Sequence, residues 1–264
     1  MTQVLKFKTG DDCEIAYRLD GDPKNPTLVF SNSIATNHQM WNAQAKTFAD
    51  KFFVVRYDMR GHGSSGVPEG AYSIDRLGRD VLELLDHLRI ERTHFCGLSL
   101  GGFVGQWLGI HAPDRIDRLV LSNTSPYLGP APQWDDLIRK TREPGSMRFF
   151  ADMFIGNWFP QSMIEHEPAV CEPFREAVLS TDPVGLAGSF AAVRDADTRR
   201  TVSLIAVPTL VIGGRSDTVT EATHSEAIAR EIPASELLLM DGVHMLNIER
   251  TAEFDQAVRS FLAS

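Results

Sequence analysis

Ser99 lies in the stretch GLSLG, residues 97–101, with a glycine two positions before it and two positions after it. A G-x-S-x-G pattern is typical of a nucleophilic serine on a sharp turn between a strand and a helix. The pattern alone is weak, because glycine and serine are common enough to produce it by chance in roughly one chain in ten of this length. Its surroundings favour the nucleophile, since the apolar run 93–97 predicts a strand and the residues after Ser99 predict a helix that reaches Pro113.

The glycines around Ser99 have a steric reason to be there. At such a turn the backbone is strained, and side chains at positions 97 and 101 would collide. Gly101, Gly105 and Gly109 also recur every four residues, which lets the helix lie close to the sheet and directs its N-terminus at an anion formed beside Ser99. The alternative, a glycine-rich turn of a nucleotide-binding fold, requires its glycines near the first strand and not in the middle of the sheet.

A serine hydroxyl becomes a strong nucleophile only when a base takes its proton. His244 is the expected base, because it follows the predicted strand 236–240 after three residues and so lies on a loop at the sheet edge that carries Ser99. The other histidines fall in turns, on predicted helices or within a strand, where a surface or core role is the expected one: His38, His62, His87, His94, His111, His166 and His224.

A histidine base needs an acid that fixes its tautomer and stabilises the imidazolium. Asp217 is the expected acid, because it follows the next-to-last predicted strand. Asn123 ends another strand, but an amide cannot balance a positive charge, and the alternative Asp241 is too near His244 along the chain to reach back easily. The resulting order of Ser99, Asp217 and His244 is the order of the α/β-hydrolase fold.

The backbone amides of Leu100 and Ile34 are the expected donors to a negatively charged oxygen that forms during the reaction. Leu100 directly follows the serine, and Ile34 lies in the loop after the predicted strand 27–31. The competing interpretation of residues 31–37 is a polar turn without a catalytic role.

Residues 57–65, YDMRGHGSS, bring together Asp58, Arg60 and His62. These residue types could form a metal site or an acid–base site. Their glycines and charges favour a structural turn instead. We therefore expect neither a metal ion nor a cofactor in this protein.

Short apolar runs alternate with helical periodicity along the chain, which predicts an α/β fold with a mostly parallel sheet and helices on both faces. Helices are expected over 75–88, near 221–232 and at the C-terminus. The predicted strands are 27–31, 52–58, 93–97, 118–123, 208–214 and 236–240. Residues 126–200 are rich in Phe, Met and Trp and lack a convincing strand, which predicts a helical insertion between two parts of a hydrolase core, 1–125 and 201–264.

The composition favours a globular protein whose partners are small molecules. The 264 residues carry a formal net charge of -9 without a block of lysine or arginine, which argues against a nucleic-acid-binding protein. Cys13, Cys96 and Cys171 are odd in number and widely spaced, so neither a disulfide framework nor a zinc site is indicated. Because no long apolar segment predicts a signal sequence or a membrane span, we expect a cytoplasmic location.

These motifs together resemble the α/β-hydrolase superfamily over essentially the whole chain. Within it, the sequence is most similar to the 3-oxoadipate enol-lactonases of the β-ketoadipate pathway for aromatic breakdown. Two segments carry that likeness: SNSIATNHQMW, residues 31–41, and FCGLSLGGFVGQWLGIHAPDRIDRLVLSNTS, residues 95–125. The glycine that is usual in the first segment is Ala35 here, which places one extra methyl group near the expected oxyanion loop.

The resemblance implies a substrate that is a five-membered enol lactone with an acetate arm, which water opens to 3-oxoadipate without a cofactor. A carboxylate of this kind is most naturally met by an arginine. Arg139 is the expected contact and Trp134 the expected cavity wall, although an ordinary surface arginine and core tryptophan remain alternatives. Arg142, Arg148 and Arg194 lie in the same segment.

Two other functions stay open from the sequence. A carboxylesterase or a C–C bond hydrolase of the same fold would use the same three residues. A ligand sensor on a hydrolase scaffold would bind in the same place, but the intact set of Ser99, Asp217 and His244 argues against it.

Overall fold

Eight strands form one sheet in the order β1-β2-β4-β3-β5-β6-β7-β8. The computed structural model describes residues 3–263. The strands are β1 Leu5–Lys8, β2 Glu14–Asp20, β3 Thr27–Ser31, β4 Phe53–Tyr57, β5 Thr93–Leu98, β6 Ile116–Ser122, β7 Thr209–Gly214 and β8 Ser235–Met240. All six predicted strands are present to within two residues at each end.

The pairing from β4 through β3 to β8 is parallel, so the prediction of a mostly parallel sheet is confirmed. The centres of β3, β5, β6 and β7 are buried, because helices cover both faces of a parallel sheet. β1 and β2 were not expected, and they extend the sheet by antiparallel pairing on to β4. β1 has four residues of which three are exposed, and so short an edge strand leaves little apolar signal in a sequence.

The strand register places the loops of the site at one edge. Ser31 at the end of β3 pairs with Gly97, and Leu98 at the end of β5 pairs with Ser122 of β6. On the other side, Gly214 of β7 pairs with Met240 of β8. The loops that follow these strands therefore start side by side at the carboxyl edge of the sheet, where α/β folds bind their ligands.

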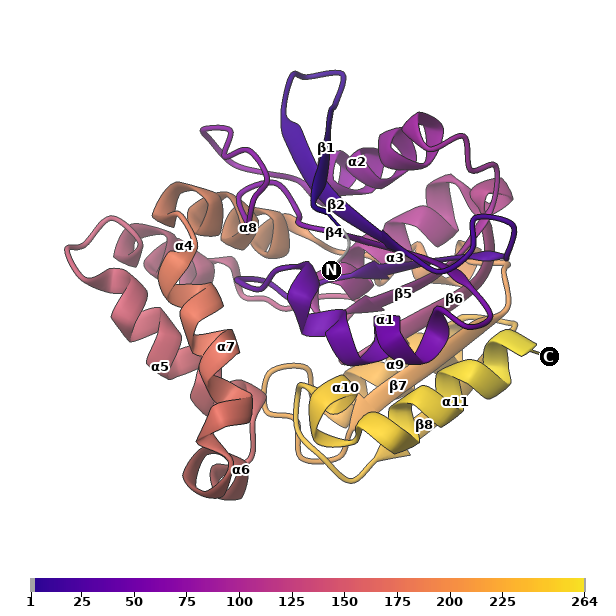
Figure 1. Ribbon diagram of the computed structural model, residues 1–264. Coiled ribbons are helices and arrows are strands. Elements are labelled where there is room, and N and C mark those ends of the chain that lie inside the picture. Colours follow the sequence, from indigo (N-terminus) through magenta and orange to yellow (C-terminus); the bar gives the residue numbers. More distant parts are fainter. Residues whose placement is uncertain (1–2, 264) are drawn as a thin grey trace.

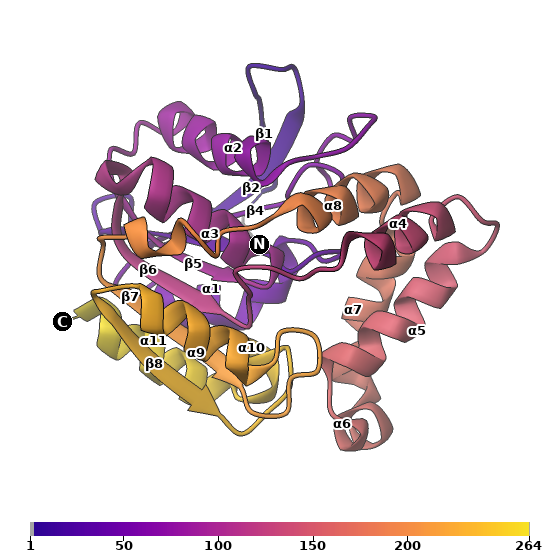
Figure 2. The ribbon, with the colours of Figure 1, turned by 180° about the vertical axis from the view of Figure 1, so that it is seen from behind.

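Helices cover both faces of this sheet (Figure 1). α1 packs against α11 on one face, whereas α3 packs against α2, β5 and β6 on the other, which Figure 2 brings to the front together with α9. The bounds are α1 Asn42–Phe48, α2 Ile74–His87, α3 Leu100–His111, α9 Ala222–Glu231, α10 Leu246–Glu249 and α11 Thr251–Ala263. Three short 3-10 helices are η1 His38–Trp41, η2 Pro113–Arg115 and η3 Val202–Leu204.

Five helices between β6 and β7 lie together beside the carboxyl edge of the sheet, at the left of Figure 1. They are α4 Ala131–Lys140, α5 Ser146–Trp158, α6 Gln161–His166, α7 Pro168–Ser180 and α8 Pro183–Asp195. Aromatic contacts join α5 to α8, since the ring of Phe190 on α8 lies 5.4 Å from that of Phe150 and 6.3 Å from that of Phe154 on α5. Contacts of this kind give the segment its own apolar centre.

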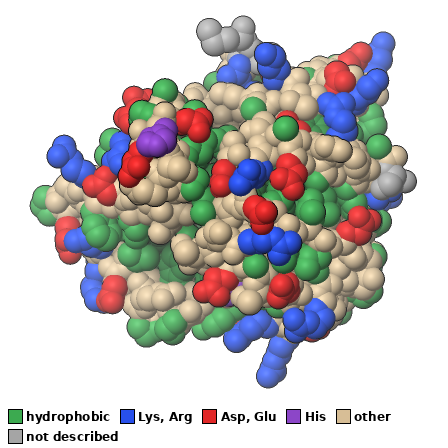
Figure 3. Space-filling view, turned by 90° about the horizontal axis from the view of Figure 1, so that it is seen from below, with side chains coloured by type: hydrophobic (Ala, Val, Ile, Leu, Met, Phe, Trp, Pro, Cys, Tyr) green, Lys and Arg blue, Asp and Glu red, His purple; other side chains and the backbone are tan. Residues whose placement is uncertain are grey.

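Acidic and basic side chains are interspersed on the face that is seen from below (Figure 3). Among residues 3–263, no helix is long and apolar enough to cross a membrane.

Candidate active site

Ser99 occupies the turn between β5 and α3. Its φ of 58° and ψ of -115° are strained values for a residue with a side chain. The serine is only 8% exposed. Backbone hydrogen bonds hold the turn, because the Ser99 amide donates to the Ser122 carbonyl at 3.0 Å and the Gly101 amide donates to the Asn32 carbonyl at 2.9 Å. The strained turn is thus held in place by β6 on one side and by the loop after β3 on the other.

Gly97 and Gly101 leave the space that this turn requires. A Cβ atom on Gly97 would overlap the carbonyl group of Gly101, and a Cβ atom on Gly101 would overlap the carbonyl group of Ser31. The collision that was expected from the spacing alone is therefore a contact of each glycine with a backbone carbonyl group. Gly105 faces Leu121 and Leu119 of β6, so α3 lies close on the sheet.

His244 and Asp217 meet behind the serine turn. His244 Nδ1 lies 2.8 Å from Asp217 Oδ2, and both residues are almost completely buried. Because an ionised carboxylate can only accept, Nδ1 is the protonated nitrogen and Nε2 keeps its lone pair. Ser99 and His244 line the same cavity.

Four further donors converge on the Asp217 carboxylate. Oδ2 accepts from Asn123 Nδ2 and from Thr220 Oγ1, each at 2.8 Å. Oδ1 accepts from the backbone amides of Val219 at 2.8 Å and Thr220 at 3.1 Å. Burial raises the pKa of Asp217, but the close contact with His244 and the hydrogen bonds from its other partners outweigh this effect and lower the pKa to about 2. The carboxylate therefore stays charged at any pH at which the protein works.

Asn123 and Thr220 were not predicted as partners of Asp217. Asn123 was considered only as an acid, whereas its amide donates to the acid. Asn123 follows β6 and Asp217 follows the neighbouring strand β7, and these two positions could have indicated the contact. Asp241, the alternative acid, has an 85% exposed side chain that pairs with Arg215 at 3.2 Å. It does not approach His244.

Ile34 lies in the loop after β3, next to the cavity that Ser99 lines. Ile34 and Leu100 both line the cavity with Ser99. Within residues 3–263 the amides of Ile34 and Leu100 have no hydrogen-bond acceptor, whereas the amides beside Ile34 do. Ala35 has a φ of 56°, which explains why glycine is the usual residue at this position. The added methyl group therefore acts through backbone strain.

The cavity beside Ser99 has a volume of about 150 Å³ and mostly apolar walls. Among residues 3–263, Asn157 of α5 is the one side-chain amide on its surface, and no lysine or arginine lines it. Among the described residues, the Asn157 side chain has no hydrogen-bond partner. The remaining lining residues come from the loop at Ile34, from β5–α3, from the loop after β6, from α4, α5 and α8, and from the loops after β7 and β8: Ile34, Ser99, Leu100, Phe103, Leu128, Trp134, Leu137, Met153, Phe154, Trp158, Phe190, Val193, Val219 and His244.

The structure separates Trp134 from Arg139. Trp134 and Leu137, three residues apart on α4, both line the cavity. Arg139 lies on another side of α4, where its 70% exposed guanidinium pairs with Asp136. The expectation that Arg139 contacts the substrate is corrected, because a helical residue five positions after Trp134 points about 140° away from it.

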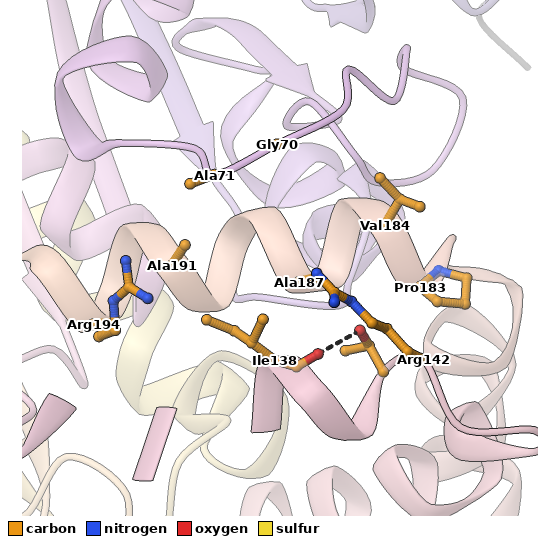
Figure 4. Close-up of a pocket in the computed structure, with 10 residues that line it drawn as sticks. Gly70, Ala71, Ile138, Arg142, Pro183, Val184, Ala187, Ala191 and Arg194 are labelled. Atoms are coloured by element: carbon orange, nitrogen blue, oxygen red, sulfur yellow. Dashed lines mark hydrogen bonds between the residues drawn. The ribbon is translucent and has the colours of Figure 1, made fainter. Parts of the chain in front are cut away.

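Two other candidate arginines, Arg142 and Arg194, line a different cleft of about 340 Å³ between α4, α8 and residues 70–71, which does not contain Ser99 (Figure 4). Arg194 pairs with Asp135 at 2.8 Å and with Asp195 at 2.7 Å. The fourth candidate, Arg148, is exposed. None of the expected arginines reaches the cavity beside the serine.

The polar side chains of the turn at residues 57–65 bond within the turn and to neighbouring segments. Asp58 Oδ1 accepts from the His38 amide at 2.7 Å, and Oδ2 accepts from the Ser64 amide at 2.8 Å. Arg60 forms two hydrogen bonds with Asp80, at 2.7 and 2.6 Å. Among the described residues, no group of three or more His, Cys, Asp or Glu side chains is placed to hold a metal ion.

The sheet order, the serine turn between β5 and α3, and the loops after β7 and β8 define a hydrolase of the α/β class. Residues 26–151 match the family model for the alpha/beta hydrolase fold. The chain belongs to the α/β-hydrolase family, and the predicted fold and hydrolase class are confirmed.

Its relatives include enol-lactonases. The chain is 37% identical over 262 residues to 3-oxoadipate enol-lactonase 2 of Acinetobacter baylyi, which covers 98% of both chains. It matches the solved structure of a hydrolase from Pseudomonas aeruginosa with a TM-score of 0.97 at 51% identity, over 99% of both chains. It matches that of the enol-lactonase from Burkholderia xenovorans with a TM-score of 0.96 at 36% identity, over 98% of this chain and 100% of the other. The predicted likeness to the enol-lactonases is confirmed.

Proposed function

We propose that this chain is a serine hydrolase that opens 3-oxoadipate enol-lactone to 3-oxoadipate through an acyl-enzyme. The observation that carries the proposal is the 2.8 Å contact between His244 Nδ1 and Asp217 Oδ2, together with the one cavity that both His244 and the strained Ser99 line. The likeness to enol-lactonases over the full chain supports the choice of substrate. Nucleophile, base and acid are all side chains of this chain, so the mechanism needs no cofactor or metal.

In the first half of the reaction, Ser99 Oγ attacks the lactone carbonyl carbon while His244 Nε2 takes the hydroxyl proton. The carbonyl oxygen becomes an oxyanion, which accepts hydrogen bonds from the amides of Ile34 and Leu100. Asp217 stabilises the imidazolium that has formed. The free amides at these two positions support this assignment.

Collapse of the tetrahedral intermediate breaks the ring C–O bond. The leaving oxygen is an enolate, which stays attached to the acyl chain because the ester was cyclic. The imidazolium of His244 gives its proton to this enolate, which becomes a ketone on the acyl chain. His244 then deprotonates a water molecule, which attacks the acyl carbon, releases the diacid and leaves the proton on Ser99.

We assign the binding of the substrate to the helical segment. α4, α5 and α8 contribute most of the apolar cavity wall, which supports a cap role for residues 126–200 over the core of residues 1–125 and 201–264. The indole of Trp134 packs along the ring. The Asn157 amide, free to donate, meets the carboxylate arm.

A second candidate function is the hydrolysis of an uncharged carboxylic ester. The apolar walls and the lack of a lysine or arginine among the lining residues favour it, because a buried carboxylate without a cation is costly. We place either activity in the cytoplasm, on the basis of the three unpaired cysteines.

Turnover of the enol lactone against an aryl acetate distinguishes the two candidates. We expect kcat/KM for the lactone to exceed that for the aryl acetate by at least tenfold in the purified protein. The reverse order would assign the protein to the carboxylesterases. Ser99→Ala is the control for both substrates, and it should lower kcat by several powers of ten.

A further inference from the structure

The loop that presents the Ile34 amide holds a residue in an unfavourable conformation. Ala35 has a φ of 56°, in the left-handed region that is unfavourable for a residue with a Cβ atom. Ala35 is completely buried, so its amide needs a partner inside the protein. That partner is His62, whose Nε2 lies 2.9 Å from the Ala35 nitrogen.

The protonation of His62 is determined by its two contacts. Nδ1 lies 3.0 Å from the Arg60 carbonyl oxygen, which can only accept a hydrogen bond. Nδ1 therefore carries the proton, and Nε2 accepts from the Ala35 amide. Burial lowers the pKa of His62 and so keeps the ring neutral. A proton on Nε2 would place that N–H group opposite the Ala35 amide N–H, and neither could accept.

His62 sits on a turn that is fixed from several sides. Arg60 is bound by Asp80 through two hydrogen bonds and by Asp11 at 2.9 Å. Gly61 is in contact with the backbone of Gly185 on α8. The turn is therefore anchored to α2 and to the helical segment, and His62 connects this anchor to the loop of Ile34.

We propose that His62 is a positioning residue that aims the Ile34 amide at the developing oxyanion by holding the next peptide unit through the Ala35 amide. This inference rests on the proposed function, in which Ile34 donates to the oxyanion. His62 touches neither the substrate nor Ser99 in this assignment. Its loss should therefore weaken transition-state binding more than substrate binding.

A matched pair of variants tests this role. In His62→Gln the side-chain oxygen can accept from the Ala35 amide, whereas in His62→Met a methyl group of similar shape cannot. We expect His62→Met to lower kcat by ten- to hundredfold with KM within threefold of the wild type, since removal of an oxyanion donor costs about 10²–10³ in kcat and here the donor is only displaced. His62→Gln should stay within threefold of the wild type in both constants.

A second measurement compares two inhibition constants. One is that of a trifluoromethyl ketone, which forms a tetrahedral adduct, and the other is that of a product-like carboxylic acid. His62→Met should weaken the ketone by the same factor as kcat and leave the acid unchanged. Equal kcat in folded His62→Met and His62→Gln would overturn the inference, provided that the wild type is active. A wild type that hydrolyses neither the lactone nor an ester would overturn the proposed function itself.

Thermal unfolding establishes that the variants are folded. If His62→Met does not fold, His62→Asn replaces it, because its shorter amide keeps the contact with the Arg60 carbonyl and cannot reach Ala35. The expected and contradicting values of kcat are the same as for His62→Met.

Discussion

Asp217→Asn is the substitution whose effect follows most directly from the geometry. Oδ1 of Asp217 accepts from two backbone amides, of Val219 and Thr220, and these donors cannot be reversed. The single carbonyl oxygen of an asparagine must therefore face them, and its NH2 group must face His244. His244 Nδ1 then accepts instead of donating, so the proton moves to Nε2 and the ring no longer acts as a base.

The magnitude has two parts. For catalysis, loss of the correct tautomer costs about 10⁴ in kcat, or about 5.5 kcal/mol. For stability, the lowering of the Asp217 pKa from 3.8 to about 2 corresponds to about 2 kcal/mol at neutral pH. Because the folded state has the lower pKa, this contribution is present above pH 3.8 and is lost as the pH falls through about 2.

The assay is steady-state hydrolysis at neutral pH, with denaturant unfolding to measure the free energy of folding. Asp241→Asn is the matched control, because its carboxylate is exposed and pairs with Arg215, away from His244. It should stay within twofold of the wild type in kcat. An Asp217→Asn variant that is folded and within tenfold of the wild-type kcat would refute the reasoning about the tautomer.

Two further predictions concern His62 and Asn157. The free energy of unfolding of the wild type should decrease as the pH drops below the ordinary histidine pKa of 6.5. Because the pKa of His62 is lowered in the folded protein, the unfolded chain binds the proton first. His62→Gln should reduce that slope between pH 7.5 and 5.5 in urea unfolding. Half-buried His94, whose pKa is also lowered by desolvation, contributes equally to both proteins. An unchanged slope would show that His62 titrates normally. Asn157→Asp should raise KM for the anionic lactone at least tenfold and leave KM for an uncharged ester within threefold, because it places a second carboxylate in an apolar cavity. Arg139→Ala is the control, and equal changes for both substrates in Asn157→Asp would remove Asn157 from the binding of the carboxylate.

The parallel core could be predicted from the sequence because each of its strands is a short apolar run between turn residues. The loops after those strands then placed Ser99, Asp217 and His244 at one edge by topology alone. The antiparallel strands β1 and β2 escaped prediction. For β1 the reason is that three of its four residues are exposed.

The walls of the cavity could not be predicted in the same way. Which side of α4 faces the serine depends on packing against α8, so Trp134 lines the cavity and Arg139 does not. The roles of Asn123 and His62 depend on contacts with residues far along the chain, Asp217 and Ala35, which no local pattern records. Asn157 stands in an apolar stretch of α5 and was passed over, although a polar residue there was the available signal.

The most direct test of the central claim is the intact mass of the protein after a rapid acid quench of a reaction with the enol lactone. If Ser99 opens the ring, the acyl-enzyme carries the complete mass of the lactone, because the leaving oxygen stays attached to the acyl chain. Peptide mapping should place that mass on Ser99, and Ser99→Ala should not acquire it. A quenched enzyme that turns over the lactone yet carries no adduct in the burst phase, or carries it on another residue, would contradict the account.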